Sequence, residues 1–170
     1  MWRCYATAVP EWMPSTASAK GRLVLAALDA FGRDGFAAVR VGELAAAART
    51  TTGPLYHHFG SKEGLYTAVR ADVERRVLDR MEGALAAGAQ LEGDALAAAL
   101  LVAFDYAERA GFARLLSEPH PEPRPDPVAA VLGDGPLGAM LAAAWRAGLA
   151  AVADGADPDE VRRALRRIAS

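Results

Sequence analysis

The stretch TTTGPLYHHFGSKEGLY, residues 50–66, concentrates side chains that are scarce elsewhere in this alanine-rich chain. Three of the six threonines, two of the three histidines and two of the four tyrosines fall within it. Hydroxyl, phenol and imidazole groups can form hydrogen bonds with phosphates and with base edges. The composition of this stretch therefore indicates a binding surface.

The sequence on either side of this stretch predicts helices. Apolar residues recur at helical spacing from Ser18 to Arg33, and Gly35 follows as a left-handed cap. A shorter run with the same spacing covers 41–48. After the stretch, Ser61 is expected to cap a long helix over 64–81. Two short helices joined by a tight turn and braced by a preceding helix form a helix-turn-helix motif, which places its second helix in the major groove of DNA.

Residues 51–59 have the pattern of that second helix. We expect Thr51 to be the N-cap, and Leu55 and Phe59, which are four residues apart, to pack on the core. The first turn would then contain Thr52, Gly53 and Pro54. A proline is tolerated there because the backbone N–H that it lacks would have no partner within the helix. Tyr56 and His57 would remain on other faces, free to contact DNA.

Over some fifty residues this region resembles the N-terminal DNA-binding domain of the TetR (tetracycline-repressor-like) family of transcriptional regulators. The resemblance rests on VGELAAAARTTTGPLYHHFGSKEGLYTAV, residues 41–69, and on the preceding LAALDAFGRDGFAAVRV. It implies a three-helix DNA-binding head, a connecting helix, an effector-binding body and a homodimer on a palindromic double-stranded DNA operator. By position, it assigns DNA contacts to Arg40, Thr51, Thr52, Gly53, Pro54, Tyr56 and His57, and a phosphate contact to Lys62.

The turn departs from the usual pattern of the family. Arg49 stands where the family usually has glycine, so we expect a positive φ there at a cost on the order of 1 kcal/mol. Thr50 replaces a residue of the valine type, and Thr52 stands where a lysine is frequent. These substitutions put DNA affinity in question more than the fold.

The rest of the chain also predicts helices. Candidates cover 91–109, 111–117, 138–151 and 157–168, and they are divided by AGAQLEGD, EPHPEPRPDP and DGADP. We therefore predict an all-α fold: a three-helix head with a helix-turn-helix, followed by a helical-bundle body shortened at its C-terminus. The expected division is a flexible tail over 1–17, a DNA-binding domain over 18–60, and an effector-binding and dimerisation domain over 61–170.

Large apolar residues in the second half are candidates for an effector pocket. The family resemblance implies a small apolar or amphipathic effector of unknown identity, which would release a repressor from DNA. The residues proposed to contact it are Phe104, Phe112, Met140 and Trp145. A constitutive or truncated DNA binder without ligand response is the alternative within the same class.

An enzyme is the alternative from a different class. Gly133, Gly135 and Gly138 spell G-x-G-x-x-G after an apolar run, with Asp154 about twenty residues on, as in a dinucleotide-binding motif. Too little sequence follows to complete a parallel sheet, so we expect a loop between helices and no cofactor.

Bulk properties limit the remaining classes. A single cysteine, Cys4, excludes an intramolecular disulfide, and Pro10 and Pro14 interrupt any apolar run near the N-terminus, so neither a signal peptide nor a membrane anchor is expected. Met13 is a possible alternative start. Residues 1–80 carry 11 Lys and Arg against 8 Asp and Glu, whereas residues 81–170 carry 8 against 13. The positive half suits a polyanion, and solvated helix faces would explain this balance equally well. The absence of an intramolecular disulfide fits the reducing cytoplasm. The neighbouring side chains of His57 and His58 diverge on a helix, so no metal site is expected.

Overall fold

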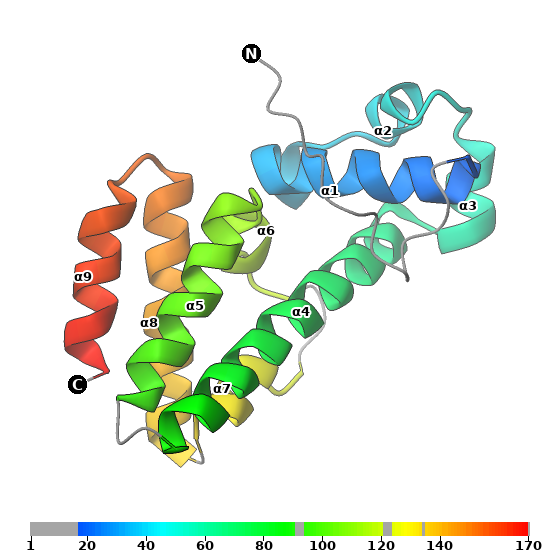
Figure 1. Ribbon diagram of the computed structural model, residues 1–170. Helices are drawn as coiled ribbons and strands as arrows, with labels where there is room; N and C mark the ends of the chain where they lie inside the picture. Colours follow the sequence, from blue (N-terminus) through cyan, green and yellow to red (C-terminus); the bar gives the residue numbers. More distant parts are fainter. Residues whose placement is uncertain (1–16, 91–93, 121–123, 134, 170) are drawn as a thin grey trace.

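The computed structural model describes residues 17–90, 94–120, 124–133 and 135–169. Within these ranges the regular structure consists of helices, α1 to α9, with no strand. The all-α prediction is confirmed. Figure 1 shows α1, α2 and α3 gathered at one end, while α4 runs from that end along the body formed by α5 to α9.

Three helices form the head: α1 (Ala19–Ala38), α2 (Val41–Ala47) and α3 (Gly53–Phe59). The hydroxyl of Ser18 caps α1 by accepting a hydrogen bond from the N–H of Gly21 at 3.0 Å. As predicted, Gly35 adopts a positive φ of 77°, which interrupts the last turns of α1. Buried apolar side chains of the head include Leu23, Val24, Ala27, Phe31, Leu44 and Leu55.

The long helix α4 (Lys62–Gln90) joins the head to the body (Figure 1). The hydroxyl of Ser61 accepts a hydrogen bond from the N–H of Gly64 at 3.0 Å, which confirms Ser61 as a cap. The predicted end at Met81 was too early, because the alanine-rich segment after it has a high helix propensity and continues the helix along α5.

The body contains α5 (Ala95–Arg109), α6 (Ala113–Ser117), α7 (Pro127–Leu132), α8 (Gly135–Ala153) and α9 (Pro158–Ile168). The carboxylates of Asp94, Asp126 and Asp157 cap three of these helices by accepting backbone hydrogen bonds. The predicted start of a helix at Leu91 lies outside the described residues. The sequence did not predict α7, because six residues are too few to show a helical period.

Buried side chains fill the interior of the body. Leu100, Phe104, Leu116, Leu141 and Trp145 are at most 2% exposed. By length and apolar composition alone, α8 could cross a bilayer. Its buried residues contact α6, α7 and α9, so α8 packs on the body through one of its faces.

Candidate nucleic-acid interface

The turn between α2 and α3 is a Schellman motif. The N–H of Thr50 donates to the carbonyl of Ala45 at 2.9 Å, and the N–H of Arg49 donates to the carbonyl of Ala46 at 3.0 Å. Arg49 has a φ of 51°, and it is the one non-glycine residue with a positive φ in the described part of the chain. The expectation of a strained, non-glycine turn at Arg49 is confirmed.

Helix α1 holds this turn in place. Nε of Arg22 donates to the carbonyl oxygen of Ala48 at 2.9 Å, across the junction between α1 and the turn. Below the turn, Leu44 of α2 and Leu55 of α3 are fully buried, as the spacing predicted. The orientation of α3 is therefore fixed by the hydrogen bond from Arg22 to the turn and by the apolar contacts of Leu44 and Leu55 in the core.

The outer face of α3 carries the polar groups that the sequence predicted. Thr51, Thr52, Tyr56 and His57 are exposed, and Tyr56 is 53% accessible. The expected N-cap was wrong by one residue: Thr52 occupies that position, with α-helical dihedral angles and no side-chain hydrogen bond to the first turn. Both threonine hydroxyls are consequently presented to solvent ahead of the helix.

Further polar rings extend this face. His57 and His58 are both exposed, and their ring centroids lie 4.9 Å apart in an edge-to-face arrangement.

Pro54 is half-buried at the start of α3, where its missing N–H costs no hydrogen bond. Gly53, which precedes it, is exposed and leaves the backbone open to close approach.

The junction between α3 and α4 is tight. Gly60 ends α3 with a φ of 75°, and α4 begins two residues later. A Cβ atom on Gly64 would lie 2.0 Å from the carbonyl oxygen of Phe59, closer than atoms can approach. Because only glycine fits at this position, the direction of α4 is coupled to that of α3.

Lys62 has a different environment from the one that the sequence suggested. Its Nζ donates to the carbonyl oxygens of Phe36 at 2.9 Å and Val39 at 3.0 Å, and it lies 4.1 Å from the ring centroid of Phe36. Two of its three donors therefore satisfy carbonyls at the end of α1. The predicted phosphate contact is untested, but the structure gives this side chain a positioning role within the head.

Three other cations lie around the motif. Arg40 precedes α2, Arg49 lies in the turn, and Lys20 in α1 places its Nζ 6.0 Å from the ring centroid of Phe59. All three are exposed, and none forms an ion pair with a described residue. Sequence reasoning singled out Arg40 but did not assign DNA contact to Lys20 or Arg49. The signal available in the sequence was that a positively charged residue, Arg49, stands in the turn of the motif.

Arg33 offsets one of the two acidic charges of α1. It is paired with both Asp29 and Asp34 at 2.8 Å, and all three residues belong to α1. The uncompensated charge of the head is positive, in keeping with a polyanionic partner.

Two helices joined by a tight turn, braced by α1 and with an exposed polar face on the second helix, define a helix-turn-helix DNA-binding protein. Residues 23–69 match the family model described as "Bacterial regulatory proteins, tetR family". This segment begins in α1, contains all of α2 and α3, and ends in α4. The head of the chain is therefore a DNA-binding domain of the tetR type.

Two solved structures are similar to most of the chain. One is a TetR-family regulator from Streptomyces coelicolor A3, with 19% identity, coverage of 89% of this chain and 94% of that chain, and a TM-score of 0.45. The other is a TetR transcriptional regulator from Rhodococcus sp. RHA1, with 19% identity, coverage of 89% and 92%, and a TM-score of 0.42.

The residues predicted to contact an effector have different environments in the body. Phe104 and Trp145 are fully buried in the core, and Phe112 is half-buried with its ring 5.9 Å from that of Tyr106. Met140 is 69% exposed on the outside of α8, so its side chain does not face the interior of the body. The sequence shows which residues of α8 are apolar. Helical spacing could not distinguish the inward face from the outward face, because this helix is apolar on most sides.

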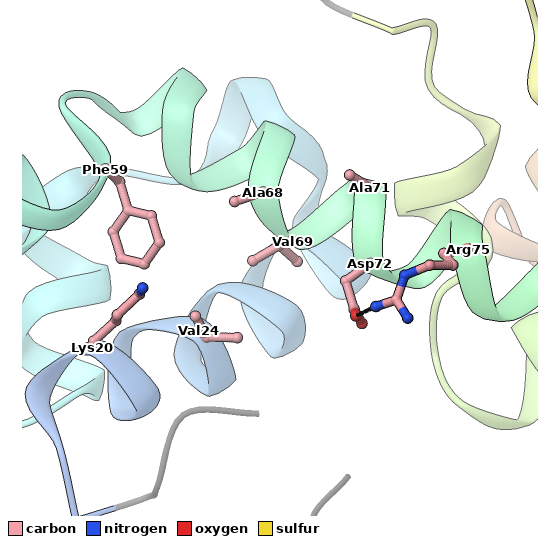
Figure 2. A pocket seen from close by; sticks show the side chains of 8 residues that line it. All are labelled: Lys20, Val24, Phe59, Ala68, Val69, Ala71, Asp72 and Arg75. Atoms are coloured by element: carbon pink, nitrogen blue, oxygen red, sulfur yellow. Dashed lines mark hydrogen bonds and ion pairs between the residues drawn. The ribbon is translucent and has the colours of Figure 1, made fainter. Parts of the chain in front are cut away.

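A pocket of about 390 Å³ lies in the head, between α1 and α4. Figure 2 shows its apolar wall, Val24, Ala68, Val69 and Ala71, between Phe59 with Lys20 at one end and an Asp72–Arg75 pair at the other. Burial raises the pKa of Asp72 above its ordinary value, although Arg76 and Arg75 act in the opposite direction.

A second pocket, of about 260 Å³, lies in the body, where α4 meets the α6–α7 connection and α8. Charged side chains line it from all three segments. Neither this pocket nor the one in the head includes any of the four predicted effector residues.

The glycine motif does not lie in a dinucleotide-binding fold. The apolar run before Gly133 forms α7 instead of a strand, which excludes the βαβ unit that the motif requires. A Cβ on Gly138 would lie 2.4 Å from the carbonyl oxygen of Ala129, so this glycine permits α7 and α8 to approach closely. The nucleotide-binding alternative at Gly133, Gly135 and Gly138 is therefore wrong.

Proposed function

We propose that the protein is a transcriptional regulator, a ligand-released repressor that binds a palindromic operator as a homodimer. A dimer would present two copies of α3 to half-sites about 34 Å apart, and ligand binding would favour a spacing that no longer matches them. As a DNA-binding regulator it would act in the cytoplasm.

The observation that carries the proposal is the exposed polar face of α3. An outer face with two threonine hydroxyls, a phenol and an imidazole has no packing role in the head, whereas each of these groups can bond a base edge or a phosphate. The proposed contact residues are Arg40, Thr51, Thr52, Gly53, Pro54, Tyr56 and His57. Arg49 joins them as a phosphate contact, and Lys62 is assigned to positioning.

The outer face of α8 supports the proposed homodimer. Pro136, Met140, Ala143 and Ala147 follow helical spacing and are exposed, so one stripe of this helix offers apolar surface to solvent. Leu137, which is 54% exposed, widens the stripe. A second copy of α8 could pack closely against its small residues, as an isologous dimer requires.

The same arrangement gives the proposed domains their roles. The head would extend over 18–60 and the body over 61–170, with α4 as the rigid connection that transmits a shift in the body to α3. The expected tail over 1–17 lies almost entirely outside the described residues.

The experiment that tests the proposal selects DNA. The purified protein would be incubated with a genomic fragment library, the bound fragments sequenced, and the affinity for the strongest one measured against salt. Recovery of a palindrome, together with a dimer in sedimentation equilibrium, supports the proposal. Weak binding without a shared sequence contradicts it, and DNA binding by a monomer contradicts the dimer. If a palindrome is recovered but no ligand alters the affinity of the protein for it, the protein is a constitutive DNA binder.

A further inference from the structure

The pocket in the body is unusual because its walls are charged. It is lined by three arginines and three carboxylates, together with His120 and prolines of the α6–α7 connection: Arg70, Arg124 and Arg146, and Glu74, Glu118 and Asp126. Arg70 and Glu74 are among the most buried side chains of the molecule, at 1% and 3% exposure. Placing ionised groups at such depth is costly unless each is paired, so their presence needs an explanation beyond packing.

The carboxylates of the pocket are fully engaged. Glu74 pairs with Nε of Arg70 at 3.1 Å through one oxygen and with Arg124 through the other. Asp126 receives two hydrogen bonds from Arg146, at 2.7 and 3.0 Å, and caps α7. Since their oxygens are occupied, these groups have little capacity left for a cationic ligand.

Two of the three arginines, in contrast, have donors that no described residue accepts. Arg70 uses Nε and Nη1, and Arg124 uses Nη2, but no described residue accepts a hydrogen bond from Nη2 of Arg70 or from Nε and Nη1 of Arg124. The Arg124 side chain is 37% exposed, so it stands where the pocket meets solvent. Guanidinium donors of this kind match a carboxylate in geometry and charge.

A chain of hydrogen bonds runs from this pocket to the DNA-binding head. Nη1 of Arg70 donates to the hydroxyl of Tyr66 at 2.9 Å, and that hydroxyl donates to Glu118 at 3.0 Å. Both oxygens of Glu118 accept from the backbone N–H of Phe36 at 3.1 Å, at the end of α1. Glu118 belongs to the body and Phe36 to the head, so this carboxylate joins the two parts.

The carboxylate of Glu118 packs closely against the backbone at Gly35. A Cβ atom on Gly35 would lie 2.2 Å from Oε1 of Glu118, so the carboxylate fits against the backbone of α1 at its kink. Arg70 also donates to the carbonyl oxygen of Pro119 at 3.2 Å, next to Glu118 in the chain. A ligand that draws the Arg70 guanidinium away from Tyr66 would thus weaken the hold of Glu118 on Phe36.

We propose that the pocket between α4, the α6–α7 connection and α8 binds a small organic carboxylate through Arg70 and Arg124, and that Glu118 couples this ligand to the head. The proposal rests on the regulator function and names the class of its effector, which differs from the apolar effector that the sequence suggested. A volume of about 260 Å³ fits a ligand below drug size.

Binding is tested first, without DNA. Sodium succinate, glutarate and benzoate would be titrated into the full chain by calorimetry at constant ionic strength, with putrescine as a cationic probe. At least one carboxylate should bind, and Arg124→Gln should weaken it by about tenfold, since a hydrogen bond to a charged group is lost. Arg109→Gln, which removes an exposed guanidinium from the surface of α5, is the matched control and should change affinity by less than about twofold. Binding of none of the carboxylates, binding of putrescine instead, or an equal effect of the two substitutions would overturn the site.

Coupling is tested by amide hydrogen exchange at Phe36, which also needs no DNA. The carboxylate that binds should accelerate exchange of this amide, and Glu118→Gln and Tyr66→Phe should abolish the response while retaining ligand affinity within about threefold, because neither supplies the guanidinium donors. Unchanged exchange at Phe36 in the liganded wild type would overturn the coupling. If DNA selection fails while these measurements succeed, the regulator proposal is at fault and the ligand site stands.

Discussion

Nζ of Lys62 lies 3.0 Å from the carbonyl oxygen of Val39 and so fastens the first residue of α4 to the segment between α1 and α2. The same nitrogen donates to the carbonyl oxygen of Phe36 at 2.9 Å. A phosphate that approached Lys62 would compete with two existing acceptors. We therefore expect Lys62 to act on DNA affinity by holding α4 in place, and exposed cations to neutralise the phosphates.

Substitution Lys62→Met tests this distinction, because methionine keeps much of the aliphatic length and removes the donors. Two carbonyls at the end of α1 lose their partner, so the free energy of unfolding should fall by about 1–3 kcal/mol. Urea denaturation followed by circular dichroism measures that change. DNA affinity should fall, but the slope of log K against log salt should be the same as in the wild type.

Arg40→Gln is the matched variant for the salt slope. Arg40 is exposed and unpaired with any described acid, so its loss should leave stability nearly unchanged and reduce the slope by about 0.9, the value for one phosphate contact. If Lys62→Met reduces the slope by a similar amount, Lys62 contacts a phosphate and its positioning role is secondary.

Tyr56 should contribute to DNA binding without contributing to stability. Its side chain is 53% exposed on the outer face of α3, so Tyr56→Phe removes a hydroxyl that has no role in the core. The affinity for the selected operator should fall by about 1 kcal/mol, and Tyr56→Ala should lose more. Fluorescence anisotropy with a labelled operator measures both, and unfolding curves serve as the control. Unchanged affinity in two folded variants would refute the contact.

The turn at Arg49 should be more stable with glycine. Arg49 has a φ of 51°, a conformation that costs a residue with a side chain about 1 kcal/mol or more, whereas glycine adopts it freely. Arg49→Gly should therefore exceed Arg49→Ala in unfolding free energy by about 0.5–1 kcal/mol. Since both variants lose the same charge, they should lose DNA affinity equally at low salt if Arg49 contacts a phosphate. Equal stability of the two variants would show that the turn relaxes.

Features that depend on a few neighbouring residues were predictable from the sequence. The cap at Ser61 and the positive φ at Gly35 and Arg49 follow from local backbone chemistry, which the identities of these residues express directly. The family resemblance supplied the arrangement of the head, and the matched residues 23–69 agree with it.

Features that depend on the packing of distant segments were not predictable. Lys62 lies far along the chain from Phe36, so nothing near it indicated that its ammonium would bond α1. The charged pocket is equally hidden, because it brings Arg70 together with Arg124 and Arg146 from the second half of the chain. The large apolar side chain of Trp145 suggested a ligand pocket, but it is part of the core.

The stability of the body should depend on pH through Asp126. Burial raises the pKa of this carboxyl, but the hydrogen bonds and charge of Arg146 lower the pKa by a larger amount. The pKa of Asp126 therefore lies below the ordinary value. A lowered pKa in the folded state stabilises the fold above the unfolded pKa of about 3.9, and this contribution is lost as pH falls through the lower folded value. Asp126→Asn, which retains a good N-cap, should cost about 1 kcal/mol at pH 7 after allowance for partial exposure.

Urea denaturation at pH 7 and pH 3 measures the effect of Asp126→Asn. The difference between wild type and variant should begin to shrink at the lower pH, because the carboxyl is then mostly protonated in the unfolded chain, whose pKa is about 3.9. A difference that is the same at both values would mean that Asp126 stabilises α7 through its cap alone. Asp157→Asn, at the cap of α9, is the control without an arginine partner.

Two glycines of α4 should respond to alanine in opposite directions. A Cβ atom on Gly64 would lie 2.0 Å from the carbonyl oxygen of Phe59, whereas nothing lies within 4 Å of one on Gly83. Gly83→Ala should stabilise the protein by up to about 1 kcal/mol, because alanine is the better helix former at an exposed position. Gly64→Ala receives the same propensity gain but must push α3 away from α4, so it should lower both stability and operator affinity. If Gly64→Ala is as stable as Gly83→Ala and binds DNA normally, the α3–α4 junction is flexible, and α4 could not transmit a movement of the body to the recognition helix.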